Sequence, residues 1–106
     1  MRFKISKDKL EQVKDTIQKV LDSELNSLRE ESNEWGLGEM HELEQIESVK
    51  KIKVERIVPY MGTKVYIKIF STKDEDYDYQ DLRAELQYRI NDWFPNVELY
   101  IDEIIS

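Results

Sequence analysis

The chain has 106 residues, of which 40% are apolar and 37% charged, and its net charge is −7. This length fits one domain with one hydrophobic core, and the apolar content excludes a disordered chain. The chain contains no cysteine, which excludes disulfides and thiolate chemistry and fits a reducing compartment. Without a signal peptide or a run of about 18 apolar residues, we expect a soluble cytoplasmic protein and no membrane contact.

The charges are unevenly distributed along the chain. Residues 30–48 hold seven glutamates and no lysine or arginine, whereas residues 49–72 hold six basic residues and one acid, Glu55. The last 34 residues hold ten acids and three basic residues. The sequence therefore predicts a single domain, 1–106, with a basic middle between acidic segments and an acidic connector at about 32–48.

The first predicted elements are a short strand and a long helix. Charged and apolar residues alternate from Arg2 to Ile5, as in a strand with one buried face. Helical spacing of apolar residues then predicts a helix from about Lys7 to Glu31. Its predicted buried stripe consists of Leu10, Val13, Ile17, Val20, Leu21 and Leu28. Two glycines, Gly36 and Gly38, end this pattern, and the connector has room for one or two further helical turns.

A β-hairpin is predicted in the basic middle of the chain. Ile52 and Val54 alternate with charged residues, and the phase breaks at 57–59, which indicates a bulge before a turn at Gly62. Residues 63–71 show the clearest period-two pattern in the chain. These two strands should therefore pair with each other.

A second helix and a last strand complete the predicted elements. Asp76 or Asp78 is placed to cap a helix that Pro95 ends. Its predicted buried stripe consists of Leu82, Leu86, Ile90 and Trp93 or Phe94. From residue 97, apolar residues alternate with charged or aromatic ones, which predicts a strand.

This order predicts an α+β two-layer sandwich, the ferredoxin-like βαββαβ fold, with two long helices on one face of an antiparallel sheet. If the first strand is absent, an αββαβ layer remains. The stretch Lys64–Asp102, with its acidic helix start, Phe94-Pro95 stop and Val97-Glu98-Leu99 strand, resembles ferredoxin-like regulatory domains such as those attached to cation-diffusion transporters. The resemblance implies the fold alone, because the His and Cys ligands that such domains often use are missing.

The uncovered face of the sheet is the predicted functional surface. Its candidate binding residues are Lys51, Lys53, Lys64, Tyr66, Lys68, Phe70 and Tyr100, with Arg2, Lys4, Glu98 and Asp102 on the same face. Aromatic residues would anchor a protein partner or a second copy, and lysines would orient an acidic partner. The sequence thus favours a non-enzymatic interaction or regulatory module, either a homodimer or a partner-binding protein.

Two other interpretations of this face stay open. RNA-recognition domains bind single strands on the same sheet surface, with bases on aromatic rings and lysines along the phosphates. A single-stranded nucleic-acid binder is therefore the alternative, although an acidic body repels phosphate. In a purely structural interpretation, Tyr66, Phe70 and Tyr100 make cross-strand pairs, or pack on a second sheet or on the connector around Trp35.

The sequence offers little support for catalysis or metal binding. The acidic run 74–78 has calcium-like spacing, but Tyr79 stands where a calcium loop needs glycine, so we interpret these acids as helix caps. The single histidine, His41, has only glutamates near it in sequence, and Ser32 and Ser48 lack the context of a nucleophile. We expect no enzyme activity, cofactor or metal.

Overall fold

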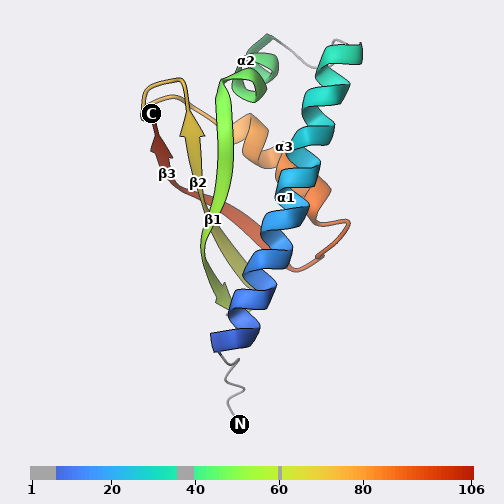
Figure 1. The fold of residues 1–106 in the computed structure, drawn as a ribbon, viewed down its shortest axis with the longest axis vertical. Coiled ribbons are helices and arrows are strands. Elements are labelled where there is room, and N and C mark those ends of the chain that lie inside the picture. Colours follow the sequence, from blue (N-terminus) through green and yellow to red (C-terminus); the bar gives the residue numbers. More distant parts are fainter. Residues whose placement is uncertain (1–6, 36–39, 60) are drawn as a thin grey trace.

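In the part of the chain that the structure describes, three helices and three strands form two layers, a sheet and the helices that cover one of its faces (Figure 1). The computed structural model describes residues 7–35, 40–59 and 61–106. In chain order the elements are α1 (Lys7–Trp35), α2 (Met40–Ser48), β1 (Val49–Pro59), β2 (Thr63–Ser71), α3 (Gln80–Ile90) and β3 (Val97–Ile105). The α+β class and the helix-covered sheet predicted from the sequence are confirmed.

The sheet is mixed, with strand order β1-β2-β3. β1 and β2 form the predicted antiparallel hairpin, whereas β3 pairs with β2 in parallel. The prediction of an antiparallel sheet is therefore wrong for this pair. A parallel pair needs a long crossover, and α3 supplies it by returning the chain to the end of the sheet where β2 began.

The ferredoxin-like topology is not confirmed, because β2 and β3 are direct neighbours in a sheet of three strands. The first predicted strand, at residues 2–5, lies outside the described residues. The order of the described elements is that of the αββαβ alternative, with α2 added inside the predicted connector. Helical turns were expected there from the spacing of Met40, Leu43 and Ile46.

The hydrophobic core lies between the helices and the sheet. Helix α1 contributes Ile17, Leu21, Leu25 and Leu28, and α3 contributes Leu82, Leu86 and Ile90, all of them buried. The sheet contributes Val49, Ile52, Val54, Val65, Ile67, Ile69, Val97 and Leu99. Burying one such side chain is worth about 1.5–3 kcal/mol, so this core decides which sheet face is covered.

Two predicted core residues lie at the surface instead. Val13 is 40% exposed, whereas Ile17, one turn later on α1, is fully buried. At the other helix, α3 ends at Ile90 rather than at Pro95, so Phe94 packs against the core while Trp93 is 58% exposed.

The start of α3 is held by side chains from elsewhere in the fold. The Asp78 carboxylate accepts a hydrogen bond from the Gln80 N–H (2.9 Å), and the buried Gln45 amide oxygen accepts one from the Leu82 N–H (2.8 Å). Tyr79, just before the helix, donates or accepts hydrogen bonds at the Oγ atoms of Ser48 (2.6 Å) and Ser71. This buried hydroxyl cluster joins α2, β2 and α3, and it assigns Ser48 a structural contact.

Candidate functional site

The sheet face turned away from the helices carries four transverse rows of side chains, one residue from each strand. The register aligns Lys51 with Phe70 and Ile105, Lys53 with Lys68 and Glu103, Arg56 with Tyr66 and Tyr100, and Val58 with Lys64 and Glu98. We call these twelve residues, together with Glu55, the open face. All seven predicted binding residues lie on it, and both long helices lie on the opposite side of the sheet (Figure 1).

The row of Arg56, Tyr66 and Tyr100 is a stack of three flat groups. The Tyr66 and Tyr100 rings stack at a centroid distance of 5.5 Å, and the Arg56 guanidinium lies 4.1 Å from the centroid of the Tyr66 ring. Such cation–π and ring contacts are worth about 0.5–1.5 kcal/mol each. The cross-strand pairing of aromatic residues, one of the interpretations of the sequence, is therefore present.

The neighbouring row places Lys68 between two carboxylates. Its Nζ lies 3.6 Å from Oε1 of Glu55 and 3.5 Å from Oε1 of Glu103. The charge of Glu55 is the main cause that raises the pKa of Lys68, and the hydrogen bond with Glu103 adds to it. Lys68 is therefore held as a cation at the centre of the face, with its charge already balanced inside the chain.

The two outer rows are simpler. Lys51 lies over the Phe70 ring, with its Nζ 4.9 Å from the centroid. At the other end, the Tyr100 hydroxyl donates a hydrogen bond to Oε2 of Glu98 (2.6 Å), which raises the pKa of the Tyr100 phenol. Lys53 and Lys64 complete the basic residues of the face.

Sequence reasoning missed Arg56 and Glu103 because it predicted the bulge of β1 at residues 57–59 and predicted none in β3. The register shifts between Val54 and Arg56, and again between Ile67 and Lys68 relative to β3. The second shift leaves Asp102 without a partner in the register and aligns Glu103 with Lys68, so the prediction that Asp102 continues the open-face alternation is wrong. Each bulge has a signal: apolar positions 54 and 57, and likewise 101 and 104, are three residues apart, where an unbroken strand needs two.

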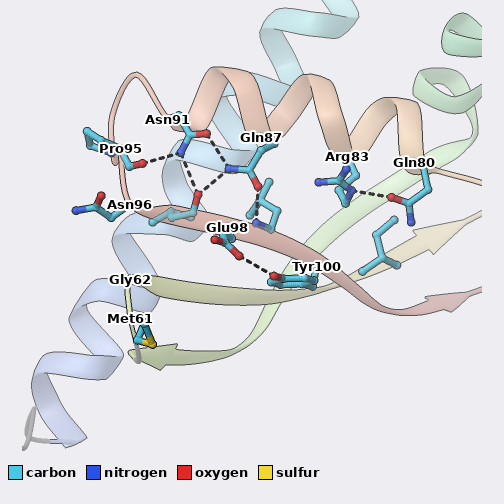
Figure 2. A pocket seen from close by; sticks show the side chains of 13 residues that line it. Met61, Gly62, Gln80, Arg83, Gln87, Asn91, Pro95, Asn96, Glu98 and Tyr100 are labelled. Carbon is cyan, nitrogen blue, oxygen red and sulfur yellow. Dashed lines mark hydrogen bonds between the residues drawn. The ribbon is translucent and has the colours of Figure 1, made fainter.

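A polar groove of about 720 Å³ runs along the outer edge of β3, beside α3 (Figure 2). Gln80, Arg83 and Gln87 line it from one stripe of α3, and Asn91 lines it from the position that follows the helix. The Gln87 side-chain amide donates to the Val97 carbonyl (2.7 Å) and accepts from the Leu99 N–H (2.6 Å). This amide satisfies the edge of β3 as a neighbouring strand would.

The opposite edge of the sheet is satisfied in the same way. The Gln18 amide of α1 donates to the Ile52 carbonyl (2.8 Å) and accepts from the Val54 N–H (2.7 Å) of β1. Each edge strand is thus bonded by one glutamine from the helix that packs on it. The two edges are thereby partly closed to a further strand, whereas the open face has no such cover from the described helices.

The remaining predicted candidates give no second site. In the described part of the chain, no group of three or more His, Asp or Glu residues is arranged to hold a metal ion. The side chain of His41 lies outside the described residues. None of the described helices is long and apolar enough to cross a membrane.

Comparison of the chain with models of known protein families, with curated proteins and with solved structures finds no match.

Proposed function

We propose that this protein is a small interaction module that binds a protein through the open face. The observation that carries the proposal is the Arg56–Tyr66–Tyr100 stack, a row of flat side chains in mutual contact on the sheet face that none of the described helices covers. Tyrosine and arginine are enriched at the centres of protein interfaces. Side chains that are already ordered lose little conformational entropy on binding, so such a surface is prepared for a partner.

The contacts on this face favour a protein partner over a single-stranded nucleic acid. Bases bind by stacking on aromatic rings, and the Tyr66 ring already contacts the Arg56 guanidinium and the Tyr100 ring. The β3 side of the face also carries Glu98 and Glu103, which would repel phosphates. A mixed surface with both charge signs is better suited to the mixed surface of another protein.

The proposal assigns binding rather than catalysis to these residues. The face offers three carboxylates, but Glu55 and Glu103 pair with Lys68, and Glu98 accepts a hydrogen bond from the Tyr100 hydroxyl. Their hydrogen-bonding capacity is used to order the surface. A general base would instead need a carboxylate directed at a substrate.

Site-specific photocrosslinking tests the face directly. A photoreactive benzoylphenylalanine at position 58, in the row beside the stack, samples the open face, and the same group at position 88 samples the solvent side of α3, where Tyr88 is 74% exposed. We expect discrete crosslinked protein products from position 58 and their loss when Arg56→Glu disrupts the stack. Position 88, although more exposed, should give only diffuse background.

Equal labelling from both positions would contradict the proposal, because accessibility alone would then explain it. A parallel titration with labelled single-stranded RNA and DNA at low salt tests the nucleic-acid alternative. Tight binding that Lys53→Glu abolishes would favour that alternative over a protein partner.

A further inference from the structure

We propose that the protein partner of the open face is a second copy of this chain, packed face to face about a two-fold axis that runs along β2. The inference rests on the proposed function, because it uses the same surface and names its occupant. Three features of the described residues support it: the order of charges across the face, the symmetry that this order requires, and the closure of the two sheet edges.

The charges are sorted by strand. On the open face β1 contributes Lys51, Lys53 and Arg56 beside one acid, Glu55, whereas β3 contributes Glu98 and Glu103. Between them, β2 contributes aromatic rings, Lys64 and Lys68, and the charge of Lys68 is balanced by Glu55 and Glu103. Charge therefore changes from positive to negative across the sheet, at right angles to the strands.

A two-fold rotation about an axis along β2 places β1 of each copy over β3 of the other and keeps each row over the same row. Lys53 then faces the partner's Glu103, and Arg56 faces the partner's Tyr100. Both contacts occur twice, as an isologous interface requires. Sheets that pack face to face are rotated by about 30° relative to each other. This rotation displaces the outer rows most, so the two central rows, which hold these residues, stay best aligned.

Other arrangements of two copies are less favourable. A two-fold axis across the strands, midway between the two central rows, would place β1 over the partner's β1 in reverse order, so that Lys53 faces the partner's Arg56. Edge-to-edge pairing along Ile52–Val54 of β1 or Val97–Leu99 of β3 would have to displace Gln18 or Gln87. The face-to-face arrangement along β2 keeps these hydrogen bonds. It places Lys64 and Lys68 over the same residues of the partner, and the charge of Lys68 is balanced by Glu55 and Glu103 within each copy.

The size of the face sets the expected affinity. Three strands of about nine residues cover on the order of 400 Å² per copy, which is about half of a standard interface. The dimer should therefore be weak, with a dissociation constant in the micromolar to millimolar range.

Sedimentation of charge-reversed variants tests the symmetry. Lys53→Glu alone and Glu103→Lys alone should each weaken self-association at least about tenfold, since each reversal makes two pairs repulsive. An equimolar mixture of the two variants should recover wild-type association, because both interchain pairs are again opposite in sign. Lys19→Glu, on the exposed side of α1, is the matched control: it should leave association unchanged and should not rescue Glu103→Lys.

Three results would overturn the inference. The first is a wild-type chain that sediments as a monomer up to about 1 mM, the second is a dimer that the single reversals leave intact, and the third is a mixture that does not recover association. Far-UV circular dichroism confirms that each variant is folded. If the chain is monomeric while position 58 still gives crosslinks to another protein, the second copy is excluded and the proposed function stands; if both experiments fail, both proposals fail.

Discussion

Single glutamine side chains complete the backbone hydrogen bonding of this fold. Gln18 and Gln87 each offer one donor and one acceptor to an edge strand, and Gln45 bonds the first turn of α3. A primary amide has the same donor and acceptor as a peptide group. Each of these side chains therefore makes backbone hydrogen bonds that a neighbouring strand or helix turn would otherwise make.

Replacing Gln87 by alanine should expose the edge of β3. The Leu99 N–H loses its side-chain partner, and the Val97 carbonyl keeps only the hydrogen bond from the Asn91 amide, so we expect a loss of about 1–2 kcal/mol in the free energy of unfolding. Exchange of the Leu99 amide proton, followed by NMR, should accelerate, as should aggregation at high concentration. Gln12→Ala, at an exposed position of α1, provides the control. Unchanged exchange at Leu99 would show that the amide contact contributes nothing.

At the scale of elements, a cluster of ion pairs links α3 to α1. The Arg89 guanidinium contacts Glu24 (3.3 Å), Glu31 and, one turn earlier on α3, Glu85 (3.1 Å). Burial lowers the pKa of Arg89, but its hydrogen bonds to these three carboxylates outweigh burial and raise it. The side chain of Arg89 is 19% exposed, so these pairs are less screened than surface pairs.

Arg89→Gln should therefore destabilise the contact between the two helices. Three neighbouring carboxylates lose their shared cation, and we expect the free energy of unfolding in urea to fall by about 1–2 kcal/mol. Arg83→Gln, whose guanidinium bonds only to the neighbouring Gln80 within the described residues, should change stability by less than about 0.5 kcal/mol. Equal effects of the two substitutions would mean that the ion pairs of Arg89 do not stabilise the fold.

The elements that follow from local periodicity are the ones that the sequence predicted. Helices α1 and α3, the β1–β2 hairpin and β3 all have apolar spacings that identify them without tertiary information. The seven predicted binding residues share the open face for the same reason, since period two assigns each strand residue to one face. The function of that face remains a prediction.

What the sequence did not predict depends on contacts between distant segments. The parallel pairing of β2 with β3 is decided by which strand lies next in space, and no residue of either strand encodes its neighbour. Likewise, Gln18 and Gln87 look like ordinary polar helix residues until the edge strands are placed beside them. Arg56 was missed for a local reason, because the phase break was placed at residues 57–59 and not at the bulge after Val54.

At the scale of the whole molecule, two electrostatic effects oppose each other. The chain carries a net charge of −7 and measures 49 × 27 × 20 Å. At about 0.01 M salt the Debye length is about 30 Å, so two copies repel each other as whole bodies. At about 0.15 M salt it falls to about 8 Å, and only the groups that meet across the face then interact.

Self-association should therefore pass through a maximum as salt increases. We expect the dissociation constant, measured by sedimentation, to be smallest near 0.1–0.2 M salt. It should rise at lower salt through net repulsion and at about 1 M salt through screening of the Lys53 and Glu103 pairs.

Glu11→Gln with Asp15→Asn, which removes two exposed charges of α1 remote from the face, should strengthen association at low salt and leave it unchanged at 0.15 M. A dissociation constant that falls steadily with salt would instead assign the dimer to aromatic contacts alone, with no contribution from the opposed charges.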